Sequence, residues 1–330
     1  MKVLFIGGSG NISTSCARLA VERGIELYVF NRGRRSVNLP ESVHRIFGDC
    51  SDAVGLKRAL AGHRFDAVVN FVVYDTDRAE RDIETFAGQT NQYVFISSAT
   101  VYQKPPRHYI ITEETPLGNP FWEYAQKKIA VEDVLMKAFR ERGFPATIVR
   151  PSFTYGDEWI PTSMSIDYTP VARLRRGLPL VVHGDGTSLW VMTHACDFAK
   201  GLVGLLGCQG AIGEPVHITS DEVLTWNQVY ETIARVVGVE PDLVHIPSKF
   251  IARINQRIGS GLLGDKAHST VFDNSKIKRL VPGFRCSVPF EQGVASTIAF
   301  LDAHPEKQQT DGNAAIEEIL QVWREHGDGP

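Results

Sequence analysis

Three observations predict an α/β fold with a doubly wound parallel sheet and a smaller C-terminal lobe. Short β-branched runs alternate with helical patterns up to Arg150, and strands that alternate with crossover helices form parallel sheets. Runs such as residues 67–73 are almost wholly apolar, which suits a sheet covered on both faces. After Arg150, prolines and glycines interrupt shorter elements. This pattern indicates a lobe built from excursions off the sheet.

Each predicted strand is a short apolar run, and the helices between strands show apolar periodicity. The strands are expected over residues 3–6, 27–30, 44–47, 67–73, 93–96 and 146–149. Helices are expected over residues 11–23, 52–61, 77–87, 122–142, 196–206, 225–237, 249–258, 275–280, 289–303 and 314–323, with residues 306–313 as a loose connection. Gly24 closes the first helix, and Thr225 and Asp273 are expected to cap later helices.

The composition is that of an ordinary globular protein. The chain has 330 residues, 43% of them hydrophobic and 22% charged, and a formal net charge of -3. It lacks the basic excess of a general nucleic-acid or anionic-membrane binder. Five cysteines without a CxxC pair support neither a disulfide framework nor a zinc site. We expect a cytoplasmic protein with no metal site, no nucleic-acid partner and no membrane partner.

A glycine-rich turn follows the first predicted strand and opens the first helix. Gly7, Gly10, Asn11 and Ile12 lie in it. Small residues let the backbone approach a pyrophosphate, and the helix N-terminus offers unpaired N–H groups to it. The turn therefore predicts a dinucleotide-binding Rossmann domain. Ser13 stands at the third glycine position, and its side chain is expected to loosen the packing of helix on sheet.

The end of the second strand distinguishes the two nicotinamide cofactors. A carboxylate there accepts from the ribose 2′-OH, but this chain has Asn31 and Arg32, followed by Arg34 and Arg35. Guanidinium groups bind a 2′-phosphate through charged hydrogen bonds. We expect NADP(H), with NAD(H) as the alternative. The other possibility is that these residues form only a solvated basic loop.

Three further residues are predicted to contact the cofactor. Asp49 and Cys50 follow the third strand, where the carboxylate would meet the adenine amino group and Cys50 would be an apolar neighbour. The alternative role for this stretch is to cap the next helix. Phe71 lies within the fourth predicted strand and is also expected at the cofactor.

Tyr124 and Lys128 are four residues apart on the long predicted helix, so both lie on one face. A nearby ammonium lowers a phenol's pKa toward the range useful for proton exchange. Ser98 ends the preceding strand, so the three groups can meet beyond the carboxyl edge of the sheet, where ligands bind in such folds. The same spacing also occurs on ordinary surface helices.

Together these motifs resemble the short-chain dehydrogenase/reductase superfamily, in particular its extended (atypical) branch, the NAD(P)-dependent sugar-nucleotide epimerase/dehydratase group. The likeness includes the glycine-rich turn, residues 97–102, Tyr124xxxLys128, residues 150–156 and residues 184–197, and covers roughly residues 1–300. The resemblance implies that Tyr124 is the general acid/base, that Lys128 holds the nicotinamide ribose and that Ser98 bonds the reacting oxygen. A homodimer is a separate expectation, and the sequence does not fix the oligomeric state. We expect residues 1–156 and about 190–222 to form the Rossmann domain, and about 157–189 and 223–330 to form the substrate lobe.

Two departures from the family pattern bear on the substrate. Ala99 and Thr100 replace the Asp-Glu pair of the dehydratases, which argues against water elimination. Trp190 stands near the position where nucleotide-sugar enzymes carry an arginine, so the substrate is expected to be sugar-like without a nucleotide diphosphate.

Candidate substrate residues lie mainly in the second half of the chain. They are Tyr155, Trp190 and Arg173, with Lys266 and His268 as weaker candidates. The resulting prediction is an NAD(P)-dependent oxidoreductase or epimerase acting on a hydroxyl or carbonyl carbon. The alternatives are a nucleotide-sugar 4-epimerase and a non-catalytic NAD(P)-binding regulatory or RNA-associated protein.

Overall fold

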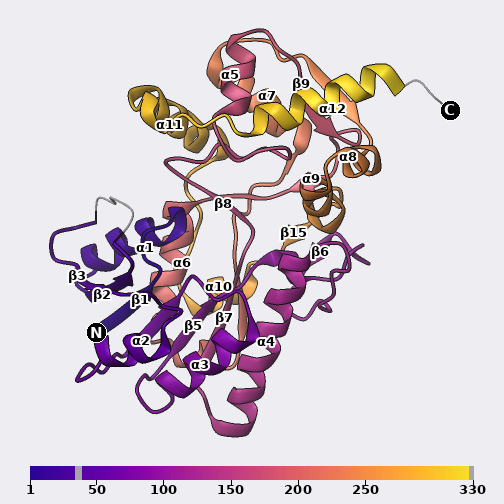
Figure 1. The fold of residues 1–330 in the computed structure, drawn as a ribbon. Helices are drawn as coiled ribbons and strands as arrows, with labels where there is room; N and C mark the ends of the chain where they lie inside the picture. The colour runs from indigo at the N-terminus through magenta and orange to yellow at the C-terminus, as the bar shows by residue number, and fades with distance from the viewer. Residues whose placement is uncertain (34–38, 327–330) are drawn as a thin grey trace.

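A seven-stranded parallel sheet forms the lower half of the molecule in Figure 1, a computed structural model that describes residues 1–33 and 39–326. The strand order is β12-β7-β5-β4-β1-β2-β3. The strands are β1 (Lys2–Ile6), β2 (Glu26–Asn31), β3 (His44–Phe47), β4 (Ala67–Asn70), β5 (Tyr93–Ile96), β7 (Ala146–Pro151) and β12 (Pro215–Ile218). The order reverses between β1 and β4, which defines the position where ligands bind in such sheets.

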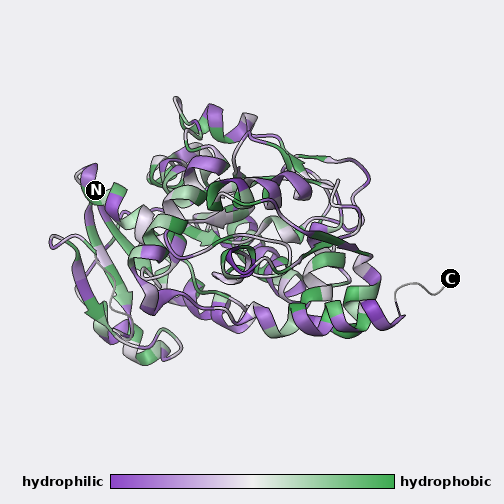
Figure 2. Cartoon of the chain, turned by 90° about the horizontal axis from the view of Figure 1, so that it is seen from above, coloured by the Kyte–Doolittle hydropathy of each residue, from purple (hydrophilic) through white to green (hydrophobic). Residues whose placement is uncertain are grey.

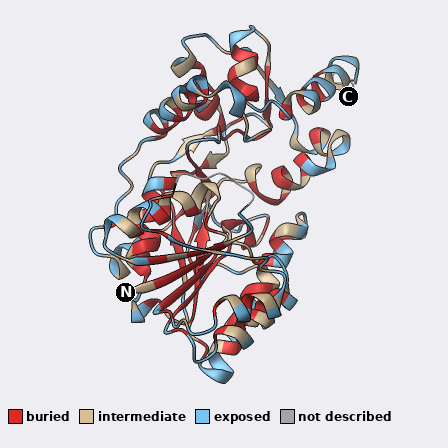
Figure 3. Ribbon diagram, turned by 60° about the vertical axis from the view of Figure 1, so that its left-hand side comes forward, coloured by how far each residue is buried: buried red, intermediate tan, exposed pale blue. Residues whose placement is uncertain are grey.

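Helices cover both faces of this sheet. The first face carries α1 (Asn11–Glu22), α6 (Ala195–Leu205) and α10 (Ser275–Leu280); the second carries α2 (Ala53–Ala59), α3 (Thr76–Phe86) and α4 (Glu123–Arg142). Alternation along β1 supplies both cores, because Val3 and Phe5 join the first face while Leu4 and Ile6 join the second. Figure 3 shows the strands buried between the two helical layers. The predicted fold class is confirmed.

The upper half of the molecule contains the remaining helices and several two-stranded sheets (Figure 1). Its helices are α5 (Thr169–Arg175), α7 (Trp226–Val237), α8 (Ser248–Ile254), α9 (Gln256–Gly261), α11 (Phe290–Ala303) and α12 (Gly312–His326). Its strands are β8 (Phe153–Tyr155), β9 (Leu180–His183), β10 (Leu189–Trp190), β11 (Met192–His194), β13 (Leu224–Thr225) and β14 (Leu243–Ile246). Hydrophilic and hydrophobic residues alternate along α12 in Figure 2, and Ile316, Ile319 and Leu320 on its apolar side are buried.

Two further short elements complete the pairing and the helices. The strand β6 (Ile110–Ile111) pairs in parallel with β15 (Val271–Phe272). A single π turn, η3 (Leu262–Lys266), follows α9. The other short turns are η1 (Ala99–Val101), η2 (Gln209–Ala211) and η4 (Pro305–Lys307). Across the described residues, no helix is both long and apolar enough to span a membrane.

Most predicted elements are present, and the differences have local causes. The strand β4 stops at Asn70, whose Oδ1 accepts a hydrogen bond from Val72 N and turns the chain. The helix predicted over 249–258 divides at Asn255, whose side chain caps α9. Thr225 caps α7 as predicted. Asn274 rather than Asp273 is the N-cap residue of α10, although Asp273 accepts from Ser275 N.

Candidate active site

The glycine-rich turn lies at the carboxyl end of β1, where the strand order reverses. Gly7 has a φ of 85°, and a Cβ there would lie 2.6 Å from Val72 Cγ1, so a larger residue is excluded. A Cβ on Gly10 would have only Ser13 Oγ, at 3.6 Å, within reach among the described atoms. The first amides of α1 have no carbonyl partner within the helix and carry its positive dipole end. This turn has the space and polarity that a pyrophosphate needs.

Ser13 tightens the turn instead of loosening the packing. It is 2% exposed, and its Oγ accepts from Gly10 N at 2.8 Å and lies 3.2 Å from the Gly7 and Gly10 carbonyl oxygens. The expectation of looser packing is therefore wrong, because the hydroxyl replaces the missing close contact with hydrogen bonds. Asn11 Nδ2 donates to Thr154 O at 3.4 Å, which links the turn to β8. Ile12 packs against the first core.

The predicted adenosine-binding residues lie along the ends of β2 and β3. Asn31 Oδ1 accepts from Gly33 N at 2.9 Å. Arg32 is exposed, and Arg34 and Arg35 lie outside the described residues. These contacts leave the preference for NADP(H) a prediction.

The stretch around Asp49 does not cap the next helix. The N-cap residue of α2 is Asp52, whose side chain accepts from Gly55 N at 2.9 Å, so that alternative is wrong. Asp49 Oδ1 accepts from Ser51 N and Oγ, and Cys50 packs partly buried against the second core. Phe71 is also partly buried, with its ring 5.3 Å from that of Phe5.

Ser98, Tyr124 and Lys128 come together at the carboxyl end of β5 and the first two turns of α4. The Ser98 hydroxyl lies close enough to the Tyr124 phenol to lower its pKa, and Ser98 Oγ accepts from Thr100 Oγ1 at 3.0 Å. Lys128 lies one helical turn after Tyr124, with its Nζ 5.7 Å from the centre of the Tyr124 ring. The three groups are thus near enough to act on one substrate oxygen and its surroundings.

Lys128 is held by the backbone. It is 2% exposed, and its Nζ donates to Val73 O at 2.8 Å and to Ile96 O at 2.9 Å. Burial lowers the pKa of this lysine to about 7. Because an ammonium has three N–H groups, one remains for a ligand hydroxyl. This geometry fits a lysine that fixes a ribose.

The pKa of Tyr124 moves in the direction opposite to the prediction. Burial, and then the neighbouring Tyr74, raise it to about 12, while the nearby Ser98 hydroxyl lowers it in part. Lys128 does not lower this pKa, because its ammonium is directed to two carbonyl groups and its own pKa is lowered. The phenol therefore keeps its proton at neutral pH. Such a group is suited to donate a proton to a carbonyl oxygen.

The three leading substrate candidates lie inside the upper half. Tyr155 is fully buried and donates to Phe290 O at 3.4 Å. Trp190 is 3% exposed and packs on Trp226, and its Nε1 has no hydrogen-bond partner among the described residues. The described contacts of these two side chains are made within the core of the upper half.

The third candidate, Arg173, has a structural role. It is 1% exposed, and its guanidinium donates to Pro179 O, to Asn313 Oδ1 at 2.7 Å and to Glu317 Oε1 at 2.5 Å. These bonds fasten α12 to α5. The guanidinium is therefore committed to an internal contact rather than to a substrate.

Two aromatic residues that the sequence patterns did not single out, Trp122 and Phe153, lie around Lys266. The Trp122 ring centre is 5.3 Å from that of Tyr124, and Phe153 meets the same lysine as Trp122: Lys266 Nζ lies 5.6 Å from the Trp122 ring and 5.7 Å from the Phe153 ring. Trp122 stands two residues before Tyr124, which is a usable signal. Phe153 and Lys266 are brought together only by the tertiary fold.

A buried ion pair supports the site from behind. Glu132, on α4 one turn beyond Lys128, is 3% exposed, and Arg150 on β7 is 4% exposed. Arg150 Nη2 donates to Glu132 Oε2 at 2.6 Å, and Ser97 Oγ donates to Glu132 Oε1. Ser97 immediately precedes Ser98. The pair therefore fixes the position of the strand end relative to the helix that carries Tyr124.

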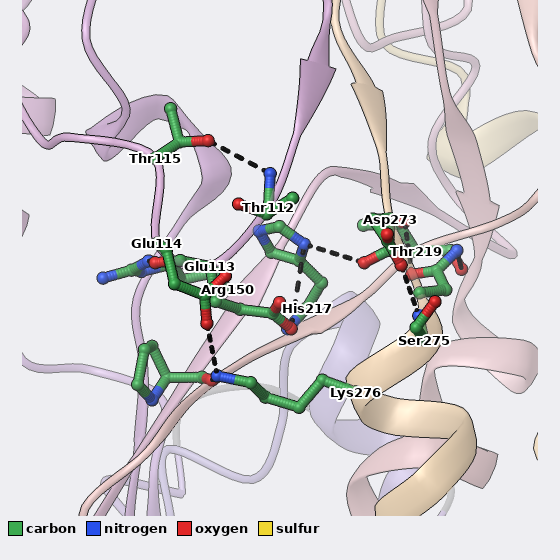
Figure 4. Close-up of polar contacts among 12 residues, drawn as sticks. Thr112, Glu113, Glu114, Thr115, Arg150, His217, Thr219, Asp273, Ser275 and Lys276 are labelled. Atoms are coloured by element: carbon green, nitrogen blue, oxygen red, sulfur yellow. Dashed lines mark hydrogen bonds and ion pairs between the residues drawn. The ribbon is translucent and has the colours of Figure 1, made fainter.

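The network continues through the buried His217, as Figure 4 shows. Arg150 Nη1 donates to Glu113 O at 3.1 Å, and Glu113 Oε1 accepts from His217 N at 3.0 Å. The His217 ring is hydrogen-bonded to Tyr102 and lies 3.3 Å from Asp273 O. Burial lowers the pKa of His217 to about 3, so the imidazole is neutral in the folded protein. Its contacts identify a structural role.

Comparison with known families gives the class of protein. Residues 3–218 match the NAD dependent epimerase/dehydratase family. The chain belongs to this family and is an oxidoreductase-type enzyme, as the sequence motifs predicted. Its family is NAD-dependent, and the glycine-rich turn described above fits such a cofactor.

Two relatives and one solved structure illustrate what the chain is similar to. The 2'-dehydrokanamycin reductase of Streptomyces kanamyceticus is 28% identical over 288 residues, which are 86% of this chain and 80% of the reductase. The chloroplast stem-loop binding protein of 41 kDa b from Arabidopsis thaliana is 25% identical over 268 residues, covering 75% of this chain and 66% of that protein. The structure of UDP-glucose 4-epimerase from Bifidobacterium longum, in complex with NAD+ and UDP, has a TM-score of 0.75 at 20% identity, covering 93% of this chain and 100% of the epimerase. That likeness shows the shared fold.

Proposed function

We propose that Ser98, Tyr124 and Lys128 form the site of an NAD(P)-dependent oxidoreductase or epimerase that acts on a hydroxyl or carbonyl carbon of a sugar-like substrate. The proximity of the Tyr124 phenol to the Ser98 hydroxyl and to Lys128 Nζ, 5.7 Å from the Tyr124 ring centre, carries this proposal. The three side chains lie at the same edge of the sheet as the glycine-rich turn. A protein that only binds a nucleotide has no need of all three side chains together.

The residues take separate roles in the reaction. The nicotinamide cofactor, when bound, supplies or accepts the hydride. In reduction, Tyr124 donates its phenolic proton to the carbonyl oxygen, and Ser98 donates a hydrogen bond to that oxygen. In oxidation, the same phenol oxygen takes the proton of the substrate hydroxyl. With its pKa raised to about 12, Tyr124 holds at neutral pH the proton that reduction requires.

The proposed cofactor contacts use backbone and side chains already in place. The Gly7 and Gly10 amides already donate to Phe30 O and Ser13 Oγ, so these two glycines would give the pyrophosphate room while the amides of Asn11 and Ile12 would bind it. The third N–H of Lys128 would hold the nicotinamide ribose. Asn31 and Arg32 at the end of β2 support NADP(H) as the preferred cofactor, because no carboxylate stands at either position. Asp49, Cys50 and Phe71 remain the predicted contacts elsewhere on the cofactor.

A ketone of a sugar without a nucleotide diphosphate is the proposed substrate. The relative with 28% identity over 86% of the chain is named a 2'-dehydrokanamycin reductase. The family resemblance places an arginine for a diphosphate near position 190, and this chain has Trp190 there instead, buried against Trp226. Cytoplasmic location, a homodimer and the domain limits given above stay predictions.

Two alternative functions can be distinguished from this proposal by experiment. Relatives named UDP-glucose 4-epimerase, such as that of Lactobacillus helveticus at 25% identity over 56% of this chain, support a nucleotide-sugar 4-epimerase. The stem-loop binding relative supports an RNA-associated protein. The first alternative requires conversion of UDP-glucose to UDP-galactose, and the second requires RNA binding that survives loss of Tyr124.

The test is a substrate panel with the purified full chain. Keto-sugars with NADPH or NADH, and UDP-glucose with either oxidised cofactor, are assayed by cofactor absorbance and by sugar analysis. Oxidation of NADPH by a keto-sugar, abolished in Tyr124→Phe, supports the proposal. Epimerisation of UDP-glucose without net cofactor turnover would favour the nucleotide-sugar 4-epimerase. Binding of an RNA stem-loop with no turnover of any sugar would overturn the enzymatic proposal.

A further inference from the structure

We infer that Lys266 binds a single anionic group on the substrate, so that the enzyme takes a sugar carrying one carboxylate or one phosphate. This inference rests on the proposed function and names its substrate class. It begins from a partly buried lysine that the proposed proton and hydride chemistry does not use.

The backbone of Lys266 is fixed from both halves of the molecule. Asn119, just before α4, donates from Nδ2 to Gly264 O at 2.7 Å, and a Cβ on Gly264 would lie 3.0 Å from Trp122 Cβ. On the side of the upper half, Ser188 Oγ donates to Lys266 O at 3.0 Å, and His183 Nε2 lies 2.9 Å from the same oxygen. The turn η3 is thus held against the start of α4.

The ammonium of Lys266 has aromatic neighbours but no acceptor. Its Nζ lies over the rings of Trp122 and Phe153, at 5.6 Å and 5.7 Å from their centres. No described side chain or carbonyl group forms a hydrogen bond or close ion pair with it. The adjacent Asp265 is already paired, since its Oδ1 lies 3.3 Å from Lys104 Nζ. Two lysines and one carboxylate leave one positive charge at this place.

An anion would complete this arrangement. Burial lowers the pKa of Lys266, and a negative partner would restore the stability of its charged form. The flanking rings give apolar faces on which a sugar can stack. One ammonium balances one carboxylate or phosphate, whereas a diphosphate is usually held by at least one bidentate guanidinium.

The location connects this charge to the reacting carbon. The Trp122 ring lies 5.3 Å from that of Tyr124, and Asp265 is close enough to contribute to the raised pKa of Tyr124. A sugar bound through its anionic group at Lys266 can therefore cover Trp122 and present another carbon to Tyr124. A protonated amino sugar would meet an uncompensated positive charge instead.

Calorimetric titration of the cofactor-loaded chain provides the test. The probes are D-glucuronate, D-glucose 6-phosphate, D-glucose, D-glucosamine and UDP. We expect glucuronate, glucose 6-phosphate or both to bind about tenfold or more tightly than glucose, as charged hydrogen bonds allow, and glucosamine to bind more weakly than glucose. The better of the two anions distinguishes a carboxylate from a phosphate.

Substitutions assign the effect to this lysine. Lys266→Met and Lys266→Gln should remove the preference for the anion with thermal unfolding unchanged, while Lys57→Met, at an exposed lysine on α2, should keep it. Equal binding of glucose and both anions by the wild type, an undiminished preference in both folded Lys266 variants, or tighter binding of UDP than of the sugar anions would overturn the inference.

The binding assay separates this inference from the proposed function. Anion binding through Lys266 without turnover of any carbonyl compound would leave the substrate site standing and remove the catalytic proposal. Reduction of neutral or amino sugars, with no anion preference in binding, would do the reverse.

Discussion

Lys128 and Lys266, two lysines near Tyr124, differ in the hydrogen-bond acceptors that the fold provides for them. Lys128 donates to the carbonyl oxygens of Val73 and Ile96, so the protein itself satisfies two of its three N–H groups. Lys266 lies over two aromatic rings without an acceptor among the described residues. Both lose hydration, and burial lowers the pKa of each. Burial alone therefore does not identify a lysine that binds a ligand. The acceptors already present decide whether the fold satisfies the ammonium or leaves it for a ligand.

The largest expected effect tests whether the residues around Lys128 are catalytic. Tyr124→Phe removes only the phenolic oxygen, so turnover should fall about 100- to 10,000-fold while cofactor affinity stays nearly unchanged. Steady-state rates and cofactor titration measure the two separately. Tyr109→Phe, at a 55% exposed tyrosine, is the control and should retain wild-type rates. A loss of less than about tenfold in folded Tyr124→Phe would remove Tyr124 from the mechanism.

The second test addresses the buried ion pair that supports the same region. Glu132→Gln leaves Arg150 buried without its carboxylate and should lower the free energy of unfolding by about 3–5 kcal/mol. Glu123→Gln on the same helix is the matched control, because its pair with Lys127 has side chains 77% and 53% exposed. That change should leave the free energy of unfolding nearly unchanged, because an exposed ion pair is screened by solvent. Urea unfolding measures both, and equal small losses would show that the pair does not fix α4.

Much of the region around Lys128 could be predicted from local sequence, whereas the region around Lys266 could not. The glycine-rich turn and the spacing of Tyr124 and Lys128 are short-range patterns that a strand-turn-helix unit and one helix face translate directly into geometry. The direction of the Tyr124 pKa shift differs from the prediction, since spacing reveals neither the burial that raises this pKa nor that Lys128 binds two carbonyl groups. Lys266 reaches the site through contacts of η3 with residues 119–122, and no local pattern encodes that approach.

The buried aromatic candidates show the same limit. The motif order predicts Trp190 at the substrate, but its burial and its packing on Trp226 depend on residues 36 positions later in the chain. Sequence distance hides such pairs.

The third test uses the pH dependence of stability to examine His217, which is buried in the hydrogen-bond network beside Arg150. The pKa of His217 falls from 6.5 to about 3 on folding. Between these values the unfolded chain binds a proton that the folded chain does not, so stability falls as pH drops through this window, by about 1.4 kcal/mol per pH unit from this group. His217→Gln should reduce the slope by about one proton in urea unfolding. His108→Gln, at an exposed histidine, should leave the slope unchanged; an unchanged slope in His217→Gln would show that His217 does not titrate on unfolding.

The smallest expected effect concerns Arg32, which unlike Lys128 and Lys266 is exposed to solvent. Arg32 is exposed at the end of β2, so its ligand must displace solvent instead of pairing with a buried charge. Arg32→Ala should weaken NADPH binding about tenfold, the value of one charged hydrogen bond, and should weaken NADH binding much less, because NADH lacks the 2′-phosphate. Fluorescence titration of both cofactors measures this difference, with Arg58→Ala, an exposed change on α2, as the control. Equal weakening of both cofactors, or a wild-type preference for NADH, would show that Arg32 belongs only to a solvated loop and would leave Lys266 as the cation that selects a ligand by charge.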